Sequence, residues 1–312
     1  MRKKLTMKRV NSITFEEGFD EYIYNCKARN LREGTIKHYK ESMKSISRFI
    51  DPNTPISDFD KNTLPNFIVE CRENLNIKDI TLYTYARDLK TLMYYFMKRD
   101  YMPTFKIDLP TADKEPIECY TNGELKALLK KPNTKTCSFS EYKNWVLINF
   151  LLSTGVRLNS FINIKIKDLD LDNKVVRIIV TKNRKPLIVP LNDTIVKVLK
   201  EYLRMRQYES EEDYLFCNSF GDKLRKSTIT QGLYQYHHSR GVTTTGIHRY
   251  RHTFAKKWIE AGGSVVILQK LLGHSSLKIT ENYINILVSD IKREVDKFNL
   301  LNEFNKSYIK LK

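Results

Sequence analysis

The stretch EYKNWVLINFLLSTGVR, residues 141–157, limits the fold more than any other part of the chain. Its apolar residues cover every face of a helix, so a helix formed here must be buried on all sides. Gly155 ends the run, and glycine is favoured where a helix closes in a left-handed conformation. We therefore expect a central helix that ends at Gly155, with a domain packed around it and Arg157 just beyond its end.

The first hundred residues have the spacing of helices. Behind Thr14, which is suited to capping a helix, apolar side chains recur every three or four positions from Phe15 to Cys26. Similar periodicity covers residues 35–50, 63–75 and 79–99, and in the last of these we expect Tyr83 on the buried face. The pattern predicts a module of four or five helices with basic outer faces.

Residues 101–118 separate this module from the rest of the chain. They contain three prolines and no sustained periodicity, which is typical of an interdomain linker. Beyond them, Thr121 and Glu124 have the spacing of a capping box at the start of a helix. Two short β runs follow at 174–180 and 186–191, joined by TKNRK as a hairpin loop.

The chain is thus predicted to be mainly α, with a small antiparallel sheet in its second half. We expect a helical domain at 12–100, a linker at 101–118, a mixed α+β domain at 119–288 and a helical tail at 289–312. The tail carries apolar residues at helical spacing, such as Ile291, Val295 and Phe298.

The charge balance points to a polyanionic partner. Fifty-four Lys and Arg against 36 Asp and Glu give a net charge of +18, and basic side chains on phosphates release condensed counterions. A general excess of lysine in the source proteome would also give a basic chain. Of these two readings, the charge favours nucleic acid.

Other function classes are disfavoured. No apolar run approaches the ~20 residues of a membrane span, and no apolar segment follows the basic N-terminus as in a secretory signal. The five cysteines are scattered, with no C-x-x-C pair, which indicates reduced thiols in a cytoplasmic protein and no zinc site. We expect neither a metal nor a cofactor.

Several residues could carry chemistry, although each has an ordinary structural explanation. His248 and Arg251 are three apart and share a helix face, but such pairs are usually solvated surface. Arg157 and the hairpin Lys182 could be a domain-edge arginine and a turn lysine. His274 follows Gly273, a predicted helix end, where it could simply complement the helix dipole. Tyr283 could be a packing residue.

The order of these residues changes their interpretation. TGVR, a basic β-hairpin, HRYRH, LLGHSS and ITENY occur with short gaps through one domain, and this set resembles the tyrosine recombinases, also called the phage integrase family. The resemblance implies a helical SAM-like core-binding domain followed by the catalytic domain. It implies six catalytic residues: Arg157, Lys182, His248, Arg251, His274 and the nucleophile Tyr283. Lys185 is an alternative to Lys182.

Two positions depart from the family pattern. Ser160 stands where the family usually has an acidic residue three positions after the first arginine, which puts the positioning of Arg157 in question. Tyr250 stands where many members have leucine, and we expect that change to be tolerated.

The resemblance also implies the reaction and the partners. DNA strands would be cut and rejoined through a 3′-phosphotyrosyl intermediate, without metal, cofactor or ATP. The partners would be double-stranded recombination sites, with a homotetramer on two sites, coupled by the tail, and possible DNA-bending accessory factors. The role would be integration or excision of a mobile element or phage. The alternatives are an Xer-type dimer resolvase, a type IB topoisomerase and a non-catalytic DNA-binding regulator.

Overall fold

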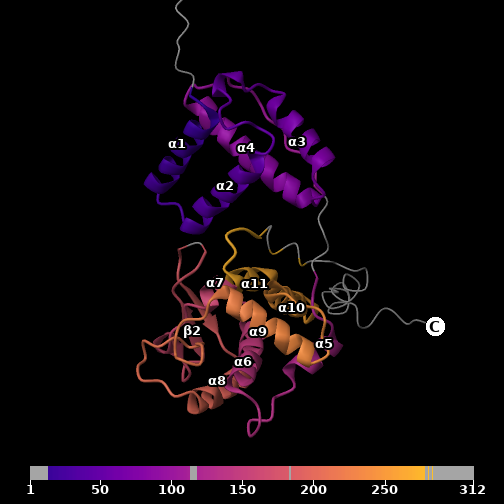
Figure 1. Ribbon diagram of the computed structural model, residues 1–312. Coiled ribbons are helices and arrows are strands. Elements are labelled where there is room, and N and C mark those ends of the chain that lie inside the picture. Colours follow the sequence, from indigo (N-terminus) through magenta and orange to yellow (C-terminus); the bar gives the residue numbers. More distant parts are fainter. Residues whose placement is uncertain (1–12, 113–117, 183, 278–279, 281–282, 284–312) are drawn as a thin grey trace, which may run out of the picture. The chain divides into compact units, whose positions relative to one another are not determined.

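The computed structural model describes residues 13–112, 118–182, 184–277, 280 and 283. The chain divides into two compact units on either side of residues 115 and 116 (Figure 1). Within the described residues the secondary structure is helical except for one small sheet, which confirms the predicted fold class. No helix among them is both long and apolar enough to cross a membrane.

The N-terminal unit is formed by four α-helices. They are α1 (Phe15–Ala28), α2 (Glu33–Ile46), α3 (Thr63–Asn74) and α4 (Asp79–Lys98), as the periodicity predicts. Thr14 caps α1 in a full capping box with Glu17, so the first helix begins at the predicted residue. Near the start of α4 it is Leu82 that is buried, whereas Tyr83 is only half-buried. The prediction that Tyr83 lies in the core is therefore wrong by one residue, because Leu82 takes that place.

The C-terminal unit is built around α6 (Phe139–Thr154), the predicted all-apolar helix. Almost the whole of α6 from Tyr142 to Leu151 is buried, because neighbouring helices contact it on several sides. These neighbours are α5 (Asn122–Leu129), α8 (Asp193–Met205), α9 (Lys226–Ser239) and α10 (Ile247–Glu260). Two further helices, α7 (Leu158–Phe161) and α11 (Val265–Leu272), lie close to where α6 ends (Figure 1).

The sheet has three antiparallel strands in the order β1-β2-β3. The strands are β1 (Leu169–Asp170), β2 (Val175–Ile178) and β3 (Leu187–Pro190). Val176 pairs with Val189, and both side chains point into the core. The sequence predicted β2 and β3 with their hairpin, but it did not predict β1, because two residues are too few to show an alternating pattern.

Gly155 closes α6 with a left-handed backbone, φ +61°. A Cβ atom at this position would lie 2.5 Å from Cδ1 of Phe254 and 2.9 Å from Cδ2 of Leu272. Both the conformation and the space therefore require glycine. This close packing brings the end of α6 directly against α10 and α11.

We predict that Gly155→Ala lowers the free energy of unfolding of the C-terminal unit by about 2–4 kcal/mol, from left-handed strain plus overpacking. Gly241→Ala is the matched control, since Gly241 has φ +71° but nothing within 4 Å of its added Cβ. It should cost only the strain, about 1–2 kcal/mol. Denaturant titration followed by tryptophan fluorescence measures this unit alone, because Trp145 and Trp258 both belong to it. Equal losses in the two variants would contradict the packing argument.

Candidate active site

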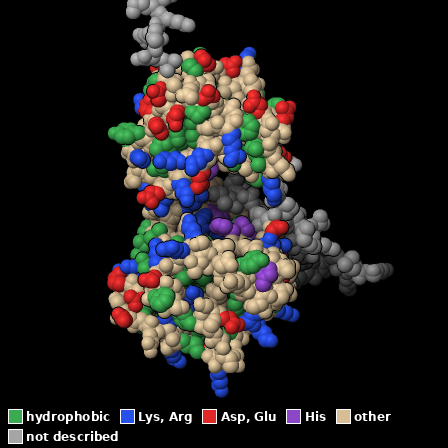
Figure 2. All heavy atoms as spheres, viewed as in Figure 1, with side chains coloured by type: hydrophobic (Ala, Val, Ile, Leu, Met, Phe, Trp, Pro, Cys, Tyr) green, Lys and Arg blue, Asp and Glu red, His purple; other side chains and the backbone are tan. Residues whose placement is uncertain are grey.

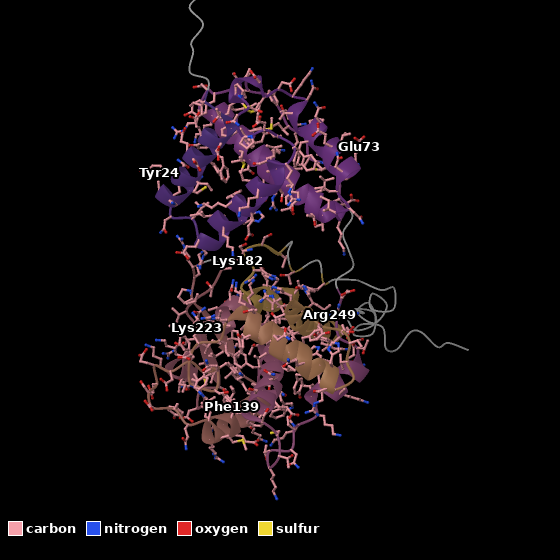
Figure 3. The ribbon with its side chains drawn as sticks, viewed as in Figure 1. Tyr24, Glu73, Phe139, Lys182, Lys223 and Arg249 are labelled. Atoms are coloured by element: carbon pink, nitrogen blue, oxygen red, sulfur yellow. The ribbon has the colours of Figure 1, made fainter. Side chains whose placement is uncertain are left out.

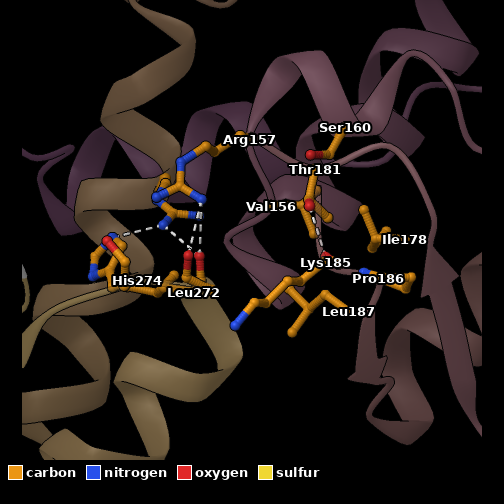
Figure 4. A pocket seen from close by; sticks show the side chains of 13 residues that line it. Val156, Arg157, Ser160, Ile178, Thr181, Lys185, Pro186, Leu187, Leu272 and His274 are labelled. Carbon is orange, nitrogen blue, oxygen red and sulfur yellow. Dashed lines mark hydrogen bonds between the residues drawn. The ribbon is translucent and has the colours of Figure 1, made fainter. Parts of the chain in front are cut away.

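A cleft of about 380 Å³ opens between the β2–β3 hairpin, the segment after α6, and the end of α11. Its walls combine basic and polar side chains with the apolar surface of the hairpin (Figure 4). The basic and polar residues that line it are Arg157, Ser160, Thr181, Lys185, Arg251, His274 and Ser275. Three of the six predicted catalytic residues, the two arginines and His274, thus share one cavity.

Arg251 projects from α10 and is buried. Its Nη1 donates to the carbonyl of Gly155 at 2.7 Å, and its Nη2 donates to the carbonyl of Leu272 at 2.8 Å. These carbonyls lie at the ends of α6 and α11, where the helix dipole is negative and favours a cation. Burial and the nearby Arg157 lower the pKa of Arg251 to about 10, so the guanidinium remains charged at pH 7.

Arg157 lies immediately after the Gly155 turn, as the N-cap of α7. Its Nη1 donates to the carbonyls of Leu272 and Gly273 at 3.2 and 3.4 Å. The carbonyl of Leu272 therefore accepts hydrogen bonds from both arginines, which brings the two guanidiniums together (Figure 4). Burial lowers the pKa of Arg157. Two adjacent cations in a partly buried cleft favour an anion between them.

His274 follows Gly273, the left-handed C-cap of α11, as predicted. Arg251 donates from Nη2 to Nε2 of His274 at 2.7 Å, since a guanidinium cannot accept. Nδ1 of His274 therefore carries the hydrogen, which it donates to Oγ1 of Thr280 at 2.8 Å. Burial, together with Arg251 and Arg157, lowers the pKa of His274 to about 4. The ring is neutral at pH 7.

His248 lies in the first turn of α10, on the same side as Arg251 three residues later. Its side chain is exposed, but the surrounding protein and the charges of Arg251 and Arg157 lower its pKa. His248 does not line the cleft itself, but its neutral imidazole lies close enough to the two arginines for their charges to act on it.

The two candidate lysines lie in different places on the hairpin. Lys182 is exposed in the hairpin loop (Figure 3) and does not line the cleft. Lys185 does line it, and its side chain reaches toward Arg157 and Leu272 (Figure 4). Both lysines thus belong to the hairpin beside the cleft, but of the two it is Lys185 that forms part of the cleft wall.

Tyr283 is half-buried against α10 and α11, beside Ala255, Leu268 and Leu272. Its hydroxyl lies 2.8 Å from Nδ1 of His252, the residue after Arg251 in α10. Burial raises the pKa of the phenol, although Arg251 and Arg157 act in the opposite direction. At pH 7 the phenol therefore holds its proton.

Basic side chains and histidines gather at this end of the C-terminal unit (Figure 2). The remainder of its visible face carries lysines and acidic side chains in a more mixed distribution (Figure 2). Among the residues whose placement is described, no group of three or more His, Cys, Asp or Glu has the arrangement of a metal site. All five cysteines are free thiols.

Two family models cover most of the chain. The model of the phage integrase family matches residues 119–289, and that of the phage integrase SAM-like domain matches residues 14–109. The chain belongs to the tyrosine recombinase, or phage integrase, family. It is accordingly an enzyme that cleaves and rejoins DNA.

Known relatives and structures resemble this recombinase over nearly its whole length. The probable integrase/recombinase of Acholeplasma phage L2 is 30% identical, with 92% of this chain and 93% of that protein covered. Tyrosine recombinase XerD of Staphylococcus saprophyticus is 26% identical, with 87% and 94% covered. The fold is that of the Tn1549 transposon integrase in complex with a circular intermediate DNA, with a TM-score of 0.73, 19% identity, and 92% and 100% covered.

The two departures from the family pattern have local explanations. Ser160 is buried in the cleft wall, and the guanidinium of Arg157 is oriented by the carbonyls of Leu272 and Gly273 without a carboxylate. Tyr250 is fully buried, and its hydroxyl is hydrogen-bonded to Nε2 of His237, whose Nδ1 donates to the carbonyl of Thr244 at 2.7 Å. The tyrosine therefore helps fix the loop that leads into α10.

Sequence reasoning assigned no role to His252. The residue is visible in the motif HRYRH, directly after Arg251, and its i+4 spacing from His248 places both on one side of α10. The available signal was this spacing, but only the fold brings Tyr283, 31 positions later, against it.

Proposed function

We propose that this recombinase cuts DNA by attack of Tyr283 on a scissile phosphate held by Arg157 and Arg251. The supporting observation is that the two guanidiniums share one carbonyl, and that the charges of both oppose the burial that raises the pKa of the Tyr283 phenol, which lies against His252 on the helix of Arg251. A forked guanidinium matches two phosphate oxygens, and two of them neutralise the charge that develops in the transition state. His248 and His274 complete the set around the phosphate.

The chemistry explains why these residue types are needed. A free phenol has a pKa near 10, so about one part in a thousand is phenolate at pH 7, equivalent to ~4 kcal/mol. Attack by Tyr283 would form a 3′-phosphotyrosyl ester and release a 5′ oxygen, which needs a proton. A lysine of the β2–β3 hairpin can supply that proton as a general acid. The ester conserves the bond energy, so a 5′ hydroxyl can reverse the step without ATP or a metal.

For the biological role we propose integration and excision of a mobile element or phage. The support is the phage L2 integrase/recombinase, which is 30% identical over 92% of this chain, against 26% over 87% for XerD of S. saprophyticus. The Xer-type role of dimer resolution is the second candidate, because curated Xer recombinases match at 24–28% identity. Repeated sequences flanking the gene, used as substrates for recombination, distinguish the two. Loss of the bounded segment supports a mobile element.

We further propose that the core-binding domain (12–100), linker (101–118), catalytic domain (119–288) and tail (289–312) act together on recombination sites in a cytoplasmic homotetramer. The tail lies outside the described residues. Support for an apolar contact between protomers comes from α11, where Val266 and Ile267 are each about half exposed. Accessory DNA-bending proteins would be optional partners of this assembly.

Tyr283→Phe should abolish covalent attachment to DNA and leave site binding nearly unchanged, because only the nucleophilic oxygen is lost. A nicked substrate that releases a short fragment after cleavage traps the adduct, which is counted on a denaturing gel. Tyr234→Phe, which removes an exposed hydroxyl on α9, is the control and should keep the wild-type yield. An adduct formed by Tyr283→Phe at full yield would refute the assignment.

Lys182→Ala should slow cleavage by orders of magnitude if Lys182 protonates the leaving 5′ oxygen. A 5′-phosphorothiolate substrate has a sulfur leaving group that needs little protonation, so it should restore the rate of this variant selectively. Lys185→Ala is the matched comparison from the same hairpin. Restoration of Lys185→Ala alone would assign the acid to Lys185, the lysine that lines the cleft.

A further inference from the structure

The hydroxyl of Tyr283 lies against a histidine that the six-residue catalytic set does not include. Nδ1 of His252 is 2.8 Å from this oxygen, and the two ring centroids are 5.6 Å apart. His252 belongs to α10, one residue after the buried Arg251, so its backbone is fixed by the same helix that holds the phosphate-binding guanidinium. One partner of the contact is thus held on the same helix as Arg251.

The direction of this hydrogen bond depends on the tautomer of His252. A neutral imidazole has one ring nitrogen that donates and one that accepts. When the hydrogen of His252 is on Nε2, Nδ1 accepts from the hydroxyl of Tyr283 across the 2.8 Å that separate the two atoms. Transfer of the phenolic proton to this ring therefore requires the Nε2–H tautomer.

Other histidines near the cleft are less suited to this task. Both ring nitrogens of His274 are engaged, one by Arg251 and the other by Thr280. His248 has no contact with the tyrosine hydroxyl among the hydrogen bonds of the described residues. Burial, followed by the nearby His248, Arg251 and Arg249, lowers the pKa of His252 below its usual 6.5, so its ring is neutral at pH 7.

We propose that His252 is the general base that takes the phenolic proton of Tyr283 during cleavage, an inference that rests on the proposed role of Tyr283 as nucleophile. As the oxygen of Tyr283 bonds to phosphorus, its proton passes to Nδ1 of His252 and the bond from phosphorus to the 5′ oxygen breaks. The 5′ oxygen leaves with a proton from the hairpin lysine. In rejoining, the 5′ hydroxyl returns its proton to the hairpin lysine as it attacks phosphorus, the bond from phosphorus to the tyrosine oxygen breaks, and that oxygen leaves with the proton that His252 returns.

The groups that face this pair agree with the assignment. On α10 these are His248, Arg249 and Arg251, and the phenol is also approached by Arg157 and Cys119. The cations stabilise the phenolate of Tyr283 and disfavour a permanently charged His252. The phenolic proton is therefore shared between Tyr283 and His252 only while the bond to phosphorus forms. Since the active form of His252 is neutral, cleavage should fall as the pH drops through its lowered pKa.

The test uses His252→Asn in the full-length protein. The side-chain amide of asparagine places a polar atom as many bonds from the backbone as Nδ1, so it can hold the hydroxyl but cannot take its proton. Single-turnover cleavage at pH 7 should fall by about 10²–10⁴-fold. The rate should then rise about tenfold per pH unit toward the phenol pKa, with the acid limb of the wild type lost. His238→Asn, an exposed histidine on α9, is the matched control and should retain the wild-type profile.

A fluorinated tyrosine at position 283 separates proton transfer from positioning. Its more acidic phenol needs less help, so it should restore much of the rate of His252→Asn and change the wild type little. An unaltered pH profile in His252→Asn, or no restoration by the fluorinated residue, overturns the inference. If the variant does not fold, ¹⁵N NMR of histidine in the unaltered protein decides: Nδ1 of His252 should be unprotonated at pH 7, and a protonated Nδ1 contradicts the proposal.

Failure of this inference is distinguishable from failure of the proposed function. If Tyr283→Phe forms no adduct while His252→Asn behaves as the wild type, Tyr283 remains the nucleophile and only the base is wrong. If Tyr283→Phe still forms the adduct, the nucleophile itself is wrong and the inference falls with it.

Discussion

The hydrogen bonds of Arg251 join the ends of two helices, and the geometry of the cleft depends on them. Its guanidinium bonds to the carbonyl of Gly155 at the end of α6 and to that of Leu272 at the end of α11. A buried guanidinium without such acceptors would be strongly destabilising. Because α6 is the most buried helix of the unit, the phosphate-binding charge is fixed directly to the core. Arg157 also donates to the Leu272 carbonyl, so its guanidinium is held by the same helix end.

The same two charges determine the protonation of their neighbours. Together with burial, they lower the pKa of His248 and of His274, the latter to about 4. The positive charge of the cleft therefore comes from the two arginines, while the neighbouring histidines are neutral at pH 7. Tyr283 must lose its proton in order to attack, but burial raises the pKa of its phenol. A neutral acceptor beside the phenol, such as His252, can take this proton without adding a negative charge to a site that must bind a phosphate.

The sequence predicts the parts of this arrangement that depend on local patterns. The nearly all-apolar segment predicts the burial of α6, Gly155 predicts its end, and the spacing of His248 and Arg251 predicts their shared face. The contacts that assemble the cleft join positions far apart in the chain, such as Arg251 with Gly155, and no local pattern encodes them. For the same reason the sequence showed neither the contact of His252 with Tyr283 nor which hairpin lysine faces the cleft.

The central claim is that Arg157 and Arg251 neutralise the charge of the scissile phosphate. A methylphosphonate at this position replaces one charged oxygen by a methyl group, so it removes the charge that the arginines would bind. Single-turnover cleavage should fall by about 10²–10³-fold in Arg251→Ala on the natural phosphodiester, but by little on the methylphosphonate. Arg157→Ala should show the same pattern. Because the Arg157 side chain is only half-buried, this variant controls for misfolding of Arg251→Ala. Equal loss on both substrates in both variants would contradict the account.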